Sequence, residues 1–198
     1  WLRRLAVDRT WAPLHFELGF GLSGETTRDP TSREEVVTLS SGLRLQGSMD
    51  LVEVSMTPSG RRQLRATDHK TGGEVPPKGV EVGGGEILQP ALYALVLEAL
   101  FPESADSPAP LGRLDYCTSQ GEFSHRDVPL SPGVRRSVKL LAESLGLRLD
   151  IGSFPALPRL EACKDCEFRS VCGPHEEFRT GRKDRSSFDD IHELRLRR

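Results

Sequence analysis

The sequence lacks any apolar run long enough to span a bilayer, and its N-terminus, Trp-Leu-Arg-Arg-Leu-Ala-Val-Asp, has neither a start methionine nor a secretory signal pattern. A spanning helix needs about 20 mostly apolar residues, and a signal peptide needs an apolar stretch before a small-residue cleavage site. The sequence therefore predicts no membrane-spanning helix. We therefore expect a cytoplasmic protein with no membrane partner, and we interpret the chain as part of a longer protein.

The sequence also has no excess of positive charge and few cysteines. A formal net charge of -2 excludes a whole-chain attraction to nucleic acid, so any DNA contact must come from local basic clusters. Only four cysteines are present, and three of them, Cys163, Cys166 and Cys172, lie close together. This crowding favours a metal or cluster site in a reducing compartment over a disulfide framework.

The apolar residues that are present suffice for one core. The chain has 198 residues, of which 36% are hydrophobic, and this predicts one substantial domain with appendages. We predict a core over residues 1–150, a Cys-rich clasp over 151–178 and a charged tail over 179–198.

An alternating segment near the N-terminus predicts the first strand of the core. Its apolar residues should be buried, and His15 and Glu17 should face the other way. Glu17 is then either a carboxylate of a substrate site or an exposed strand residue. The predicted buried set is Leu14, Phe16, Leu18 and Phe20.

Charged side chains occupy two consecutive predicted strands in the middle of the chain. Residues 43–50 alternate between apolar and polar, so Asp50 projects from the polar side of a strand. After a turn at 57–60, residues 63–70 form the return strand, on which Asp68 and Lys70 share a face. Two carboxylates and an ammonium can then converge, an arrangement suited to a hard divalent ion and a phosphoryl transition state. Charged strand edges that deter pairing are the alternative interpretation.

The next predicted helix, residues 86–100, adds two polar groups to this pattern. Gln89 and Tyr93 are four residues apart and so lie on one helix face. A Gly-x-x-Asp strand, an Asp-x-Lys strand and a Gln-x-x-x-Tyr helix in this order resemble the RecB-type branch of the PD-(D/E)XK nuclease superfamily. The resemblance extends from about Phe16 to Cys172. Capping and packing are the alternative roles of Gln89 and Tyr93.

The resemblance implies an α/β fold with a restriction-endonuclease-like core. A central mixed, mainly antiparallel sheet would be flanked by helices and followed by a C-terminal Cys-rich clasp. The implied reaction is metal-dependent hydrolysis of DNA phosphodiester bonds. Its implied catalytic residues are Asp50, Asp68, Lys70, Gln89 and Tyr93.

The resemblance also implies a metal site. Asp50, Asp68 and the main-chain carbonyl of His69 would hold Mg²⁺ or Mn²⁺, while Lys70 would assist the attacking water. Members of this branch usually have a further metal-binding histidine on an upstream helix. No residue before Asp50 matches that motif convincingly, so we expect the metal site of this chain to be incomplete.

In family terms, the chain would be the exonuclease or endonuclease domain of a helicase-nuclease in double-strand break repair and recombination. Its partners would be DNA and a helicase subunit or domain. The alternative is a non-catalytic DNA-binding or scaffolding module of a repair complex, and the joint presence of Asp50, Asp68 and Lys70 argues against it. A zinc-bound interaction domain is a third interpretation and would need neither acid.

The three C-terminal cysteines fit either a zinc site or an iron-sulfur cluster on their chemistry alone. Their spacing resembles AddB-type and CRISPR-associated nucleases, which implies a 4Fe-4S cluster with its fourth cysteine upstream of the nuclease core. The fourth ligand is then expected outside this chain, with Zn²⁺ as the alternative metal. Cys117 and His175 are the alternative fourth ligands within it.

Overall fold

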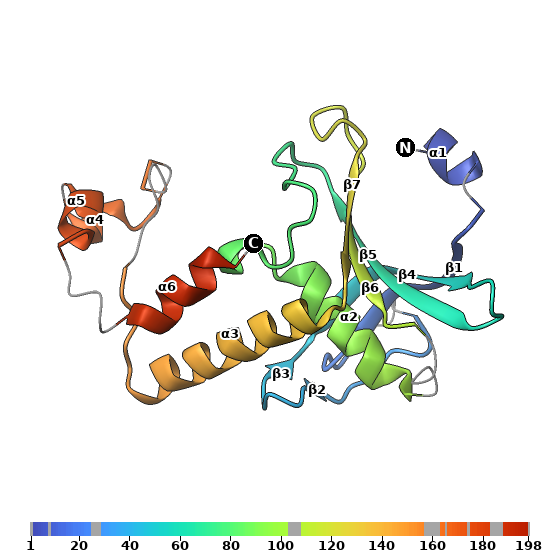
Figure 1. The fold of residues 1–198 in the computed structure, drawn as a ribbon, viewed down its shortest axis with the longest axis horizontal. Coiled ribbons are helices and arrows are strands. Elements are labelled where there is room, and N and C mark those ends of the chain that lie inside the picture. Colours follow the sequence, from blue (N-terminus) through green and yellow to red (C-terminus); the bar gives the residue numbers. More distant parts are fainter. Residues whose placement is uncertain are drawn as a thin grey trace.

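The computed structural model describes residues 2–7, 9–24, 29–102, 108–156, 163–164, 166–173, 175–182 and 188–197. A five-stranded sheet of order β1-β4-β5-β6-β7 forms the centre of the fold (Figure 1). Its strands are β1 (Ala12–Phe20), β4 (Gly47–Met56), β5 (Arg62–Lys70), β6 (Leu111–Tyr116) and β7 (His125–Pro129). A separate two-stranded sheet pairs β2 (Val37–Thr38) with β3 (Arg44–Leu45), and a short helix, α1 (Leu2–Val7), precedes β1.

The central sheet is mixed, as predicted. The β1–β4, β4–β5 and β6–β7 pairs are antiparallel, and β5–β6 is parallel. A parallel pair requires a crossover connection, and helix α2 (Gln89–Leu100) lies between β5 and β6 in the chain. This β5–α2–β6 unit places the start of α2 beside the C-terminal ends of two neighbouring strands.

Helix α2 packs closely on the sheet because small residues face each other at the contact. Ala91 and Ala94 are fully buried, and an added Cβ on Gly112 of β6 would lie only 2.0 Å from the main-chain oxygen of Pro90. Helix α3 (Pro132–Asp150) begins at the N-cap Ser131, whose hydroxyl accepts the Val134 N–H at 3.1 Å. The largest side chains of the resulting core include Phe20, Leu18, Met49, Leu97, Val52, Val82 and Val96.

Strand β1 departs from the predicted alternation. Leu18 and Phe20 are buried, but Phe16 is 61% exposed, so its predicted burial was wrong. The β1–β4 register shifts between Pro13 and His15, and Glu17 has a positive φ of 51°. Such irregularities break the simple in-out pattern of a strand.

The face of β5 that carries Arg65 and Thr67 is polar although these residues are buried. The Arg65 guanidinium binds both carboxylate oxygens of Glu53, at 2.8 and 2.7 Å, and Thr67 donates to the same carboxylate. The Trp11 ring covers Arg65 at 4.1 Å from its centroid. Leu64 and Ala66, which alternate with these residues, belong to the apolar core, so the sheet separates an apolar face from a polar one.

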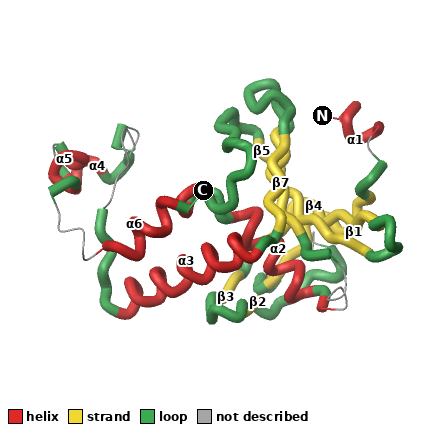
Figure 2. The backbone as a smooth tube through the Cα atoms, viewed as in Figure 1, coloured by secondary structure: helices red, strands yellow, loops and turns green. Residues whose placement is uncertain are grey.

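The C-terminal part extends away from the sheet along α3 (Figure 1, Figure 2). Short helices α4 (Arg169–Cys172) and α5 (Glu176–Thr180) lie at the far end, and α6 (Asp189–Leu196) returns beside α3 to η1 (Gly83–Gly85). Arg148 of α3 binds Asp190 of α6 at 2.5 Å. Residues 179–198, predicted as a charged tail, thus include a helix that packs against α3 and η1. Within the described residues, no helix combines the length and apolar character needed to cross a bilayer.

Candidate active site

Asp50 lies at the point where β4 diverges from β5. Its Oδ2 atom accepts the main-chain N–H of His69 at 2.8 Å, and the His69 Nδ1 atom lies 3.5 Å from the same oxygen. The Asp50 side chain is 35% exposed. This carboxylate is therefore anchored to β5 and still accessible to a ligand.

Asp68 and Lys70 occupy one face of β5, as their spacing predicts. Lys70 Nζ lies 2.7 Å from Asp68 Oδ2, and the Asp68 side chain is only 7% exposed. Burial raises the pKa of Asp68 above its usual value; the Lys70 ammonium opposes this rise, and the negative charge of Asp50 adds to it. The negative charge of Asp50 thus disfavours the ionised form of Asp68, and a cation bound by these carboxylates would offset this effect.

Gln89, the first residue of α2, connects this acid-base pair to the helix. Its side-chain oxygen accepts from Lys70 Nζ at 2.7 Å, and its Nε2 donates to Asp68 Oδ1 and, at 3.0 Å, to the Tyr93 hydroxyl. One amide therefore contacts both members of the pair and the tyrosine. The structure brings Asp68, Lys70, Gln89 and Tyr93 into a single hydrogen-bonded network, with Asp50 beside it.

Tyr93 fixes the network to β4 through a group that the sequence pattern did not indicate. Its hydroxyl donates to the main-chain oxygen of Ser48 at 2.7 Å, and its ring packs edge-on against Phe20. Burial raises the pKa of Tyr93, so the phenol stays protonated at neutral pH. Because Ser48 contributes a main-chain oxygen, no side-chain pattern could have revealed it.

Glu17 and His15 have separate surroundings despite their nearness in sequence. The β1–β4 register places Glu17 opposite Asp50, and Glu17 Oε2 accepts from the Ser48 hydroxyl at 3.4 Å. His15 instead stacks on Phe101 and contacts the Asp29 carboxylate at 3.1 Å. Glu17 therefore borders the candidate site, whereas His15 ties β1 to the following loop.

Comparison with known families agrees with this arrangement. The sequence matches the PD-(D/E)XK nuclease superfamily over residues 1–173. The chain belongs to this superfamily. A search of curated proteins returns no significant match. Nucleases of the superfamily usually depend on a divalent metal ion, so the acidic residues of this site should fit one.

The donor set of the PD-(D/E)XK site fits such an ion. Mg²⁺ and Mn²⁺ prefer carboxylate and carbonyl oxygens, and Asp50 and Asp68 supply oxygens whose mutual repulsion a cation would relieve. The carbonyl of His69, the residue directly after Asp68, remains a predicted third ligand. These residues fit part of a hard-metal site, and the predicted lack of an upstream histidine ligand stays a prediction.

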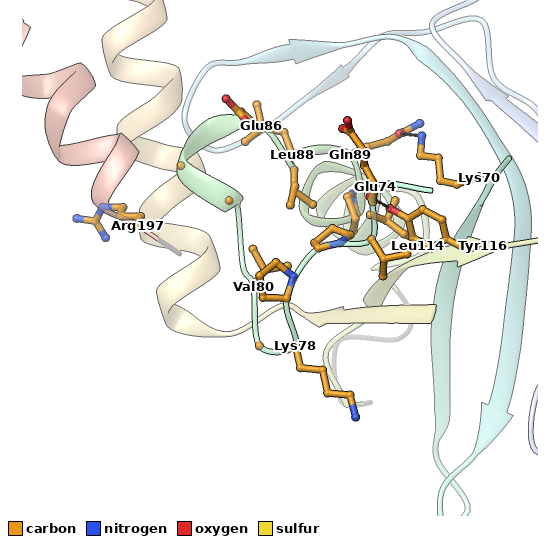
Figure 3. A pocket seen from close by; sticks show the side chains of 18 of the residues that line it. Lys70, Glu74, Lys78, Val80, Glu86, Leu88, Gln89, Leu114, Tyr116 and Arg197 are labelled. Atoms are coloured by element: carbon orange, nitrogen blue, oxygen red, sulfur yellow. Dashed lines mark hydrogen bonds between the residues drawn. The ribbon is translucent and has the colours of Figure 1, made fainter. Parts of the chain in front are cut away.

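A cleft of about 860 Å³ opens beside the nuclease site (Figure 3). Lys70, Gln89 and Tyr116 lie toward one end, and Arg197 lies at the other. The loop before α2 forms a wall, where Tyr116 donates to the Glu74 carbonyl at 2.8 Å. The cleft therefore joins the catalytic lysine predicted from sequence to the C-terminal helix α6.

The predicted cluster ligands lie in the distant α4 region. Cys163 is buried, Cys166 is exposed and Cys172 ends α4. Cys117 directly follows β6 of the central sheet, whereas α4 lies away from that sheet, at the far end of the C-terminal part (Figure 1). In this arrangement Cys117 does not join the three C-terminal cysteines, and their iron-sulfur role stays a prediction.

Proposed function

We propose that this domain is a Mg²⁺- or Mn²⁺-dependent deoxyribonuclease that hydrolyses phosphodiester bonds. The observation that supports this proposal most directly is the Asp68–Lys70 pair, which is held by Gln89 beside a second carboxylate, Asp50. A packing or capping role for Gln89 would not require contacts with both charged partners. A divalent ion bound by Asp50, Asp68 and the His69 carbonyl would polarise the phosphoryl group and acidify a water molecule.

The residues of the chain have separable roles in this reaction. The Lys70 side chain is 37% exposed, so its ammonium can donate to a phosphate oxygen or hold the attacking water while it still contacts Asp68. Hydrogen bonds from Gln89 restrict the side-chain positions of Asp68 and Lys70, and a hydrogen bond with Tyr93 restricts the side chain of Gln89. Fixed dipoles and charges of this kind stabilise developing negative charge without having to reorganise during the reaction.

The decisive experiment compares Asp68→Ala with the unmodified protein on single-stranded and duplex DNA, with Mg²⁺ or Mn²⁺. We expect the variant to lose more than about a hundredfold in rate. Asp150→Ala is the matched control, because Asp150 is exposed at the end of α3, away from the site. DNA binding without metal-dependent cleavage by the unmodified full-length protein would instead support the scaffolding alternative.

We also propose that the domain acts within a helicase-nuclease of double-strand break repair and recombination. The order of the Gly-x-x-Asp, Asp-x-Lys and Gln-x-x-x-Tyr motifs supports this assignment. The full-length protein with its helicase partner should degrade duplex DNA ends only when ATP is supplied. ATP-independent degradation at the same rate would refute the coupling to a helicase but not the nuclease activity.

We further propose that Cys163, Cys166 and Cys172 ligate a 4Fe-4S cluster, with the fourth cysteine outside this chain. The surrounding segment has little core of its own, since Phe168 and Val171 are 70% and 84% exposed, and ligation of a cluster would hold it together. Iron and sulfide analysis tests the assignment. Full-length protein should contain the cluster and lose it in Cys166→Ser, whereas stoichiometric zinc without sulfide would refute it.

A further inference from the structure

A second set of metal-ligating groups lies at the C-terminal ends of β5 and β6. His69 and Asp115 are register partners in the parallel β5–β6 pair, and the Cys117 N–H donates to the Lys70 carbonyl at 2.9 Å. One ligand atom from each of His69, Asp115 and Cys117 lies within 4.8 Å of the other two. Among the described residues, no other trio of histidine, cysteine or acidic side chains is gathered this closely.

These groups lie on the face of the sheet opposite the Asp68–Lys70 pair. Side chains alternate along a strand, so His69 shares its face with Thr67, whereas Asp68 and Lys70 project from the other. On β6, Leu114 and Tyr116 line the cleft, which leaves Asp115 on the polar face. The trio is therefore separate from the Asp68–Lys70 pair, but its His69 ring adjoins the Asp50 carboxylate, with His69 Nδ1 3.5 Å from Asp50 Oδ2.

The chemistry of the trio favours zinc over magnesium. An imidazole nitrogen, a carboxylate oxygen and a thiolate sulfur form a mixed set that Zn²⁺ accepts at about 2.0–2.3 Å, whereas Mg²⁺ selects oxygen. The three ligand atoms are at most 4.8 Å apart. Small side-chain movements would bring them to the shorter separations between the ligand atoms of a tetrahedral zinc site. Asp115 is only 2% exposed, and a buried carboxylate gains from a directly bound cation.

We propose that His69, Asp115 and Cys117 form a Zn²⁺-binding site that leaves one coordination position for a further ligand. His125 occupies the position opposite Asp115 on β7 and is the nearest candidate on that strand for the fourth ligand. The site uses the His69 ring, while the proposed catalytic site uses the His69 carbonyl. The same residue also donates its N–H to Asp50 at 2.8 Å.

This shared residue gives zinc binding a functional consequence. A divalent ion on the His69 ring would lie near Asp50, and repulsion between two like charges would weaken Mg²⁺ binding on the other face. Zinc should therefore inhibit cleavage at limiting Mg²⁺, and Mg²⁺ should in turn weaken zinc binding, because linkage is reciprocal. This consequence rests on the proposed nuclease function, but zinc binding itself does not.

Cobalt spectroscopy tests the site without any activity measurement. In a protein with Cys163, Cys166 and Cys172 replaced by serine, Co²⁺ should bind with a single thiolate charge-transfer band. Further replacement of Cys117→Ser should abolish the band, and Asp115→Asn should weaken Co²⁺ binding by about tenfold or more. A band that survives Cys117→Ser, or a folded parent protein that binds no Co²⁺, would overturn the proposal.

A second measurement keeps the test independent of that multiple variant. With the C-terminal cysteines retained, Cys117→Ser should bind one Zn²⁺ fewer than the unmodified protein in a titration against a chromophoric chelator, with circular dichroism as the check on folding. Asp150→Ala, which changes an exposed residue at the end of α3, is the control and should retain this zinc. Equal stoichiometry in the unmodified and Cys117→Ser proteins would also overturn the proposal. If zinc binds as expected but cleavage is absent, only the nuclease function fails.

Discussion

Replacement of Gln89 by alanine should impair catalysis much more than DNA binding. The side chain makes two hydrogen bonds to the charged groups of Asp68 and Lys70 and one to the neutral Tyr93 hydroxyl. A hydrogen bond to a charged group contributes about 1.5–3 kcal/mol. Water can enter the space left by alanine and replace part of these bonds. We therefore expect the stabilisation of the transition state to fall by about the energy of one such bond. At about 1.4 kcal/mol per tenfold, kcat should fall roughly 10- to 150-fold.

The assay is single-turnover cleavage of a labelled oligonucleotide at saturating Mg²⁺, together with DNA affinity measured in Ca²⁺. Gln63→Ala is the matched control, because Gln63 lies on β5 with Asp68 and Lys70 but, within the described residues, its side chain donates to the exposed Ala109 carbonyl at 3.3 Å and contacts no charged group. Gln89→Glu should be at least as impaired as Gln89→Ala, since it removes the amide donor and places a third negative charge beside Asp68. A loss below about threefold in Gln89→Ala, or equal losses of rate and affinity, would refute the positioning role.

Three further predictions concern different parts of the domain. Lys70→Ala should lower the cleavage rate far more than DNA affinity, because one lysine supplies few of the phosphate contacts; equal losses would show a binding role. Burial alone would raise the pKa of Asp127, but hydrogen bonds and charge from Arg113 outweigh it and lower that pKa. The pair therefore stabilises the fold above the ordinary aspartate pKa of about 4 and loses this contribution as pH falls through the lowered value. Asp127→Asn should lower the free energy of unfolding by about 1 kcal/mol or less at pH 7, because Asp127 is 39% exposed. The urea-unfolding midpoint of this variant should also fall less steeply as the pH is lowered than that of the unmodified protein; an equally steep fall would contradict this. Gly112→Ala should destabilise by about 1–3 kcal/mol or more in urea, because its Cβ would clash with the Pro90 oxygen, whereas Gly146→Ala, with open space around it, should not.

The sequence predicted the parts of the site that depend on spacing along one element. Asp68 and Lys70 share a face because strand side chains repeat every second residue, and Gln89 and Tyr93 share one because helix neighbours are four residues apart. The same local logic failed for Phe16, whose exposure follows from an irregular register between β1 and β4. Register depends on the partner strand and cannot be read from one strand alone.

The contacts between elements were decided by tertiary structure. The parallel β5–β6 pairing brings Cys117 to His69 and Asp115, although their sequence separation gives no sign of it. The same crossover sets Gln89 against the Asp68–Lys70 pair, and the return of α6 to η1 extends the cleft to Arg197. The sequence by itself determined the nuclease superfamily and predicted the candidate site residues and their order, because local periodicity and motif order are properties of the chain. Which groups finally meet depends on long-range packing of the apolar face, and only the folded structure contains that information.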